Sequence, residues 1–275
     1  MYALLKKLSS INDLSFPPTL QRLSRSATAS RLAVRAARMS FLICGAGRSG
    51  TSLLMGMLDN HDRLEVAFEW QAACLYEEGK FERGPDARDR RIRAFVAECE
   101  REAAHHSDKI WGNKITTEQL DGLNDLHQKC PHHRAGVLDA FFNHHLCGVK
   151  VVYIIRDGRT CVRSKINRTT QSIEAACRRW NYAVEVLQFL KERHSGNMTL
   201  RFEDLVTAPE ATLRRICAFL EVEFQPAMLL GTTNSKIPAE YRRVGLDLDR
   251  LNLDGIPGEW ARHIVPGLRY CGYVD

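Results

Sequence analysis

Residues 41–54 read Phe41-Leu42-Ile43-Cys44-Gly45-Ala46-Gly47-Arg48-Ser49-Gly50-Thr51-Ser52-Leu53-Leu54. This stretch combines a short apolar strand (41–44), a glycine-bearing loop and the opening of a helix (51–58). Glycines let the backbone curl around an anion, while loop N–H groups and the helix N-terminus supply partial positive charge. The spacing from Gly45 to Gly50 matches the phosphate-binding loop G-x-x-x-x-G-K-S/T, except that Thr51 stands at the lysine position. The sequence therefore predicts a phosphate cradle that carries an arginine, Arg48, and lacks the usual lysine.

The net charge of +6 is concentrated at one end of the 275-residue chain. Residues 1–39 hold seven Lys or Arg and one acidic residue, so residues 40–275 carry 32 charges of each sign. A balanced folded part argues against a polyanion-binding surface, and we expect no nucleic-acid partner. Residues 1–39 are expected to form a basic N-terminal extension, either loosely ordered, in weak contact with a membrane surface, or acting as a transit peptide. The first of these is favoured because such tails are usually solvated.

The cysteine pattern predicts a reducing compartment, and hydropathy predicts no membrane-spanning segment. The nine cysteines form no C-x-x-C pair, and the start of the chain shows no secretory pattern. We therefore expect reduced thiols used as small core residues, and a cytoplasmic location. No apolar run approaches the roughly 20 residues that cross a bilayer.

Strand and helix patterns alternate from residue 40 onward. A continuous β-branched run at 151–155 is typical of a strand buried on both faces of a parallel sheet. This alternation predicts a doubly wound α/β domain over residues 40–275, with a mostly parallel sheet and helices on both faces. Residues 230–258 are irregular and suit a covering loop. The remaining expected elements are helices at 86–105, 173–194 and 209–220, and a strand at 198–202.

A second motif follows the strand at 151–155. Arg156-Asp157-Gly158-Arg159 stands at the end of this strand, and Ser164 lies eight residues beyond Arg156 along the next helix. An arginine and a serine in these positions can converge on a further phosphate. In doubly wound sheets ligands bind at the carboxyl ends of strands, where the glycine loop also lies.

Together these motifs resemble the sulfotransferase superfamily, enzymes that use 3′-phosphoadenosine 5′-phosphosulfate (PAPS). The chain is most similar to the tyrosylprotein sulfotransferase-like and generic bacterial branch, which carries R-S-G-T-T-L and R-D-G-R-x-x-V-x-S-x-I-x-R. The first motif corresponds to residues 48–53 and the second to residues 156–168. The resemblance implies a P-loop-type fold, PAPS as co-substrate and no metal. It implies that the donor contacts Arg48, Ser49, Gly50, Thr51, Ser52, Arg156, Ser164 and Arg168, with Arg156 and Ser164 at the 3′-phosphate.

The resemblance also implies catalytic residues. A glutamate twenty-one residues beyond the loop arginine acts as the base in this branch, and that position is Glu69. Arg48 and Lys114, the latter in Trp-Gly-Asn-Lys, would stabilise the charge that develops on the leaving oxygen. Glu65 and His61 are alternative bases. The expected acceptor is a hydroxyl of a glycan, lipid, small metabolite or peptide.

The chain departs from the family pattern in several places. Phe202 replaces the tyrosine of a strand motif, and the late serine and lysine before Trp260 are absent, so Arg242 or Arg243 is a candidate replacement at the 3′-phosphate. A small-molecule P-loop kinase and a non-catalytic nucleotide-binding relative remain alternatives. A His/Cys cluster over residues 127–147 matches no standard zinc spacing.

Overall fold

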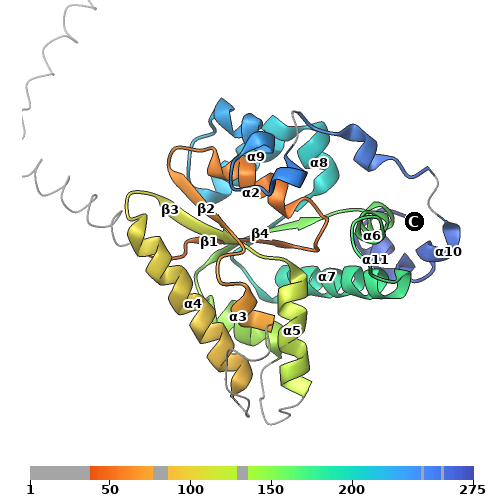
Figure 1. The fold of residues 1–275 in the computed structure, drawn as a ribbon, viewed down its shortest axis with the longest axis horizontal. Coiled ribbons are helices and arrows are strands. Elements are labelled where there is room, and N and C mark those ends of the chain that lie inside the picture. The colour runs from red at the N-terminus through yellow and green to blue at the C-terminus, as the bar shows by residue number, and fades with distance from the viewer. Residues whose placement is uncertain (1–37, 77–85, 129–135, 243–244, 255–256) are drawn as a thin grey trace, which may run out of the picture. The chain divides into compact units, whose positions relative to one another are not determined.

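A five-stranded parallel sheet lies at the centre of the computed structural model (Figure 1). The described strands are ordered β2-β3-β1-β4-β5, and each neighbouring pair is parallel. This confirms the predicted α/β fold. Their bounds are β1 Phe41–Gly45, β2 Leu64–Phe68, β3 Ile110–Lys114, β4 Lys150–Ile155 and β5 Asn197–Arg201.

Both faces of the sheet are buried because alternate side chains of its central strands enter two separate cores. In β1, Leu42 and Cys44 pack into one core, while Phe41 and Ile43 pack into the other. A side-chain period of two explains why a continuous apolar run is required at this position.

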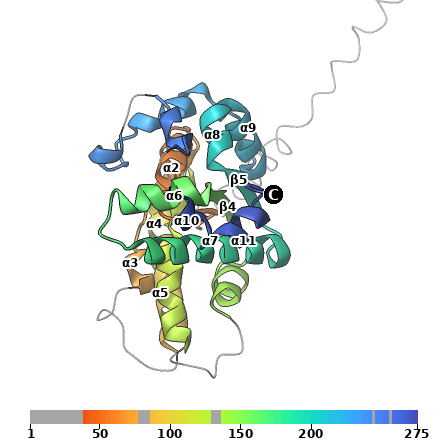
Figure 2. The same cartoon turned by 90° about the vertical axis from the view of Figure 1, so that its right-hand side faces the viewer.

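Helices cover each face (Figure 1 and, after a quarter turn, Figure 2). On one side lie α3 (Ala73–Tyr76), α4 (Ala87–His105), α5 (Thr117–Gln128), the π-helical η1 (Asp139–His145), α7 (Ile173–Arg193) and α11 (Val265–Tyr270). On the other lie α2 (Thr51–Asp59), α8 (Phe202–Thr207), α9 (Pro209–Leu220) and the 3₁₀ segment η2 (Pro226–Thr233). The remaining described elements are α6 (Gly158–Ile166), η3 (Ala239–Tyr241), η4 (Leu248–Leu251) and α10 (Gly258–Ala261).

The two strands β2 and β3 and the end of the last predicted strand differ most clearly from the sequence-based expectation, and several helices, among them α3 and α5, were also not predicted. β2 and β3 were not predicted, because Glu65 interrupts the short apolar run of β2 and β3 ends in Gly-Asn-Lys. In β3, Gly112 is required by the Phe41 ring, which lies 2.4 Å from where a Cβ would stand. The strand predicted at 198–202 ends at Arg201, and Phe202 opens α8. The family's strand aromatic is therefore a helix residue here, and it packs into the core on the α2 side of the sheet.

The structure describes residues 38–76, 86–128, 136–242, 245–254 and 257–275. Almost all of the predicted basic extension (1–39) and Arg243 lie outside these ranges, as do Cys130, His132 and His133 of the His/Cys cluster. All described residues belong to one compact unit, 36–275. Within the described ranges, no helix combines the length and apolar character that crossing a bilayer demands.

Candidate active site

The glycine loop joins β1 to α2 at the carboxyl edge of the sheet. Buried Ser49 donates its hydroxyl to the Ala46 carbonyl at 2.6 Å and so closes the turn. Arg48 and Gly50 both adopt left-handed backbone conformations, with φ of 77° and 95°. A Cβ on Gly50 would lie 2.4 Å from the Phe202 ring, so glycine is required at this position by both conformation and space.

The second motif lies directly against this loop. Arg156, after β4, donates Nη1 to the Arg48 carbonyl at 3.0 Å. Ser164, on α6, accepts a hydrogen bond from Arg48 Nε at 3.3 Å. β4 pairs with β1, so the two strands end side by side and bring residues more than a hundred positions apart into contact.

Buried contacts hold Arg156 in place. Its Nε donates to Thr160 Oγ1 at 2.9 Å, and its guanidinium lies 4.6 Å from the centre of the Phe202 ring. Trp180, from the family-like Trp-Asn pair, donates its indole N–H to the Arg156 carbonyl at 3.0 Å. Burial is the largest influence on the Arg156 guanidinium, and together with the nearby charges of Arg250 and Arg48 it lowers its pKa below the ordinary value.

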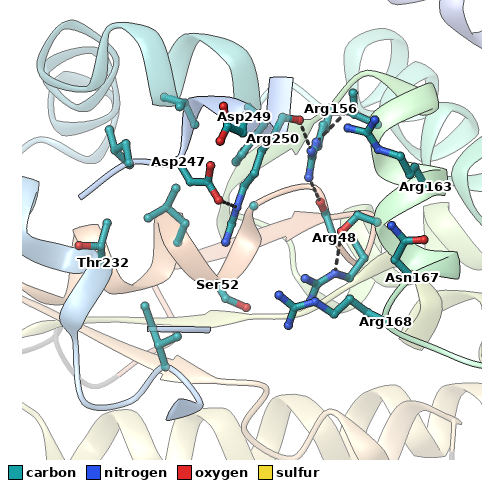
Figure 3. A pocket seen from close by; sticks show the side chains of 18 of the residues that line it. Arg48, Ser52, Arg156, Arg163, Asn167, Arg168, Thr232, Asp247, Asp249 and Arg250 are labelled. Carbon is teal, nitrogen blue, oxygen red and sulfur yellow. Dashed lines mark hydrogen bonds and ion pairs between the residues drawn. The ribbon is translucent and has the colours of Figure 1, made fainter. Parts of the chain in front are cut away.

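A pocket of about 490 Å³ is lined by side chains of both motifs, among them Arg48 and Arg156 (Figure 3). Among the described residues, five arginines and two aspartates face it, so its charge suits an anion. Figure 3 shows Arg48, Arg168 and Arg250 directed into this pocket. The apolar residues that line the pocket are Leu53, Phe202, Val206, Ile237 and Leu246.

One wall is a covering segment, residues 245–254, that lies within the irregular region expected to cover the site. Arg156 Nη2 donates to the Arg250 carbonyl at 2.5 Å. From α6, Arg163 donates to the carbonyls of Asn252 and Asp254, at 2.6 and 2.9 Å (Figure 2 shows this segment close to α6). The Arg250 side chain forms an ion pair with Asp247, Nε to Oδ2, at 3.2 Å.

The proposed base and its partner stand at neighbouring strand ends. Glu69 follows β2 and Lys114 ends β3, which pairs with both β2 and β1. Glu69 Oε1 forms an ion pair with Lys114 Nζ, and Oε2 accepts a hydrogen bond from Gln119 Nε2 at 2.8 Å. Burial lowers the pKa of Lys114 despite the opposing charge of Glu69. Glu69 keeps about a third of its side chain exposed (32%), so a second molecule can reach it.

A largely buried ion pair between α5 and α6 holds the glycine loop at Gly47. Both oxygens of Glu118, on α5, accept the Gly47 N–H, at 2.9 and 3.2 Å. Glu118 is also paired with Lys165 of α6. Burial acts to raise the pKa of Glu118, but the Lys165 charge and the Gly47 N–H together hold it below its ordinary value.

The pocket brings together most of the residues expected to bind the donor. It is lined by Arg48, Gly50, Ser52, Arg156, Ser164 and Arg168. Ser49 and Thr51 are buried and do not line it. Glu69 and Lys114 do not line it either, and form their own pair at the same sheet edge.

The alternative candidates lie elsewhere. Glu65 is paired with Lys236 and Lys109; although burial raises its pKa, these hydrogen bonds and charges bring it below the ordinary value. His61 is buried before β2, at the opposite sheet edge, with its ring Nε2 2.7 Å from the Glu223 carbonyl. Arg242 donates to the Ser235 and Ile237 carbonyls and does not line the pocket.

Sequence reasoning missed several residues of the site. Arg163 and Asn167 share the Ser164 side of α6, and their spacing from Thr160 is a helical-face signal that could have found them. Arg250 belongs to no sequence motif that could have indicated it. Gln119 and Lys165 contact residues that are 47 or more positions away in the chain, so no local pattern indicates them.

No metal site forms among the residues the structure describes: they contain no group of three His, Cys, Asp or Glu side chains able to hold an ion. Within the His/Cys cluster, His144 pairs with Asp139 and His145 with Asp89. None of the eight described cysteines is in a disulfide, and all but Cys147 are buried, as expected for core thiols.

Comparison with known proteins places this site in a family context. Residues 40–226 match the model of the Sulfotransferase family. The chain is 25% identical to a protein-tyrosine sulfotransferase of Drosophila melanogaster over 270 residues, covering 84% of the chain and 51% of that protein. It is 30% identical to protein-tyrosine sulfotransferase 2 of Gallus gallus over 149 residues, covering 45% and 40% respectively. The chain thus spans about half the length, or less, of these curated relatives.

Solved structures share the fold. The sulfotransferase domain of the Synechococcus PCC 7002 olefin synthase has a TM-score of 0.58 at 16% identity, covering 85% of this chain and 94% of that one. The sulfotransferase domain from the curacin biosynthetic pathway has a TM-score of 0.50 at 15% identity, covering 83% and 97%.

Proposed function

Because the chain belongs to the sulfotransferase family, we propose that it transfers a sulfuryl group from PAPS to an acceptor hydroxyl. The observation that carries this proposal is the contact between the two motifs. Arg48 of the glycine loop hydrogen-bonds Ser164, and Arg156 hydrogen-bonds the loop backbone, within one arginine-lined pocket. A nucleotide with two separate anionic ends fits such a pocket.

The donor would be held by residues of this pocket. Arg48, Gly50 and Ser52 would face the 5′ end, and Arg156, Ser164 and Arg168 the 3′-phosphate. Arginine suits this task because its planar guanidinium binds phosphate oxygens in pairs. The apolar lining gives the adenine ring a surface on which to pack.

In the proposed reaction, the acceptor oxygen attacks sulfur and its proton passes to the Glu69 carboxylate. The new O–S bond forms as the bond from sulfur to the bridging phosphate oxygen breaks. The electron pair of that bond leaves with 3′,5′-ADP. Arg48 and Lys114 stabilise the negative charge that develops on the leaving oxygen.

The acceptor is proposed only as a hydroxyl compound. Protein tyrosine, which gives the curated relatives their names, is one candidate beside glycans, lipids and small metabolites.

Binding of immobilised 3′,5′-ADP tests the donor site. We expect the wild-type protein to bind and Arg156→Lys to lower the affinity about tenfold or more, because bidentate contacts are lost. Arg214→Lys is the matched control, since Arg214 is an exposed α9 residue paired with Glu210. Absence of wild-type binding would contradict the proposal.

Incubation with radiolabelled PAPS and a fractionated extract tests the reaction. Glu69→Gln should lower the labelling rate about a hundredfold or more, because the base is lost, while 3′,5′-ADP binding persists. A wild-type protein that binds 3′,5′-ADP yet neither labels any fraction nor releases sulfate would instead be a non-catalytic relative. Thermal protection by Mg-ATP and not by 3′,5′-ADP would favour the kinase alternative.

A further inference from the structure

The first turn of α5 carries one half of a capping box, formed by a glutamine that also has a second contact. Thr116 precedes the helix, and Gln119 stands three residues later, the spacing at which a side chain reaches back to the helix start. Gln119 Oε1 accepts the Thr116 backbone N–H and also the Thr116 hydroxyl, the latter at 3.1 Å. Gln119 is 5% exposed, so its amide lies inside the protein.

These contacts fix the orientation of the Gln119 amide. An N–H donor of the backbone must face an oxygen, so the amide cannot be flipped without setting donor against donor. The NH₂ group is thereby directed at Glu69 and donates to Oε2 at 2.8 Å. Lys114 pairs with the other oxygen, Oε1.

The Glu69 carboxylate is thus held from three sides. Its backbone has a left-handed φ of 55°, which sets the direction of the side chain. Its own N–H donates to the Lys114 carbonyl at 2.9 Å, tying this residue to the end of β3. Strained backbone of this kind is typical of functional positions.

We propose that Gln119 is a positioning residue for the base: its fixed amide holds Glu69 Oε2 and so aims the carboxylate at the acceptor hydroxyl. This inference rests on the proposed sulfuryl transfer. The base has several rotatable bonds, and a small misplacement of a reacting group strongly reduces rate. A hydrogen bond to the charged carboxylate is also stronger than one between neutral groups.

Gln119→Glu separates this role from helix capping. Glutamate still accepts the Thr116 N–H, so the cap is retained, but it presents a carboxylate to Glu69 in place of a donor. Gln119→Met removes both contacts at similar volume. The matched control is Gln225→Glu, because Gln225 Nε2 also donates to a carboxylate, that of Asp62, at 2.6 Å at the opposite sheet edge.

The measurement is transfer of ³⁵S from PAPS to the fraction that the wild type labels, with release of ³⁵S-sulfate to water as a second readout. We expect Gln119→Glu and Gln119→Met to lower the rate about tenfold or more, and Gln225→Glu to leave it unchanged. Affinity for 3′,5′-ADP, which also reports folding, should stay within about twofold of the wild type. In a Glu69→Gln background, Gln119→Glu should cause no further loss.

Two results would overturn the positioning role. One is a wild-type rate in Gln119→Glu, as expected if the glutamine serves only the cap. The other is an equal loss in the wild-type and Glu69→Gln backgrounds. A wild-type protein that consumes no PAPS would defeat the proposed function itself, and this shows before any variant is compared.

Discussion

Replacing Lys165 by methionine should destabilise the protein more than replacing Lys165 and Glu118 together. Lys165→Met removes the cation paired with the Glu118 carboxylate and leaves it with hydrogen bonds from the Gly47 and Glu118 backbone N–H groups. The double variant with Glu118→Gln removes the charge and keeps an oxygen for Gly47. An uncompensated buried charge costs more than the loss of both charges.

The structure sets the expected magnitude. The side chains of Lys165 and Glu118 are 3% and 18% exposed, so solvent screens the pair weakly. Breaking a buried pair from one side costs about 3–5 kcal/mol, a large part of the roughly 5–15 kcal/mol that stabilises a typical domain. In a domain of this size that corresponds to a fall in Tm of roughly 6–20 °C.

Thermal and urea unfolding of the wild type, both single variants and the double variant form a complete cycle. We expect the double variant to recover at least about 1 kcal/mol relative to Lys165→Met. Additive single effects, or a Lys165→Met protein that melts within about 2 °C of the wild type, would refute the argument that the pair is energetically coupled.

Three further variants test other contacts. Gly50→Ala should lower unfolding free energy by about 1–3 kcal/mol or more in urea, because φ is 95° and the new methyl group meets Phe202 at 2.4 Å; no loss would contradict the left-handed loop. Trp180→Phe should cost about 1–3 kcal/mol and weaken 3′,5′-ADP binding, since the Arg156 carbonyl loses its donor, and unchanged binding would argue against that support. The folded protein holds the pKa of Glu65 below its ordinary value, so its stabilising contribution is present at neutral pH and is lost as pH falls through and below 4.5. Glu65→Gln should therefore lose less stability than the wild type in acid titrations followed by circular dichroism, and parallel curves would count against this.

Elements with local signals were predicted well from the sequence. α9 begins at Pro209 and ends at Leu220 as expected, because proline and an acidic residue mark its first turn and its apolar face is regular. β1 and β4 were evident from continuous apolar runs. The contact of the glycine loop with Arg156 and Ser164 was predictable, because the carboxyl ends of parallel strands lie at the same edge of a sheet.

Features that depend on tertiary partners were not predictable. β3 contains Asn113, whose buried amide forms hydrogen bonds with the Trp70 backbone. The sequence of the strand gives no sign of this contact, so a polar residue at this position argued against a buried strand. Gln119 meets Glu69 across fifty residues of chain. Arg250 belongs to a segment without periodicity, so only its place over the pocket reveals it. The cytoplasmic location and the roles of residues 1–39 stay predictions.

The covering segment is fastened through its main chain. Arg156 and Arg163 grip the carbonyl oxygens of Arg250, Asn252 and Asp254, atoms that every amino acid carries, proline included. Substitutions along 245–254 therefore keep these carbonyl anchors available while changing the side chains that line the pocket. Mutation in evolution or in the laboratory can therefore vary the side chains of this segment while its main chain stays attached to Arg156 and Arg163. Such a segment is well suited to the evolution of substrate selectivity.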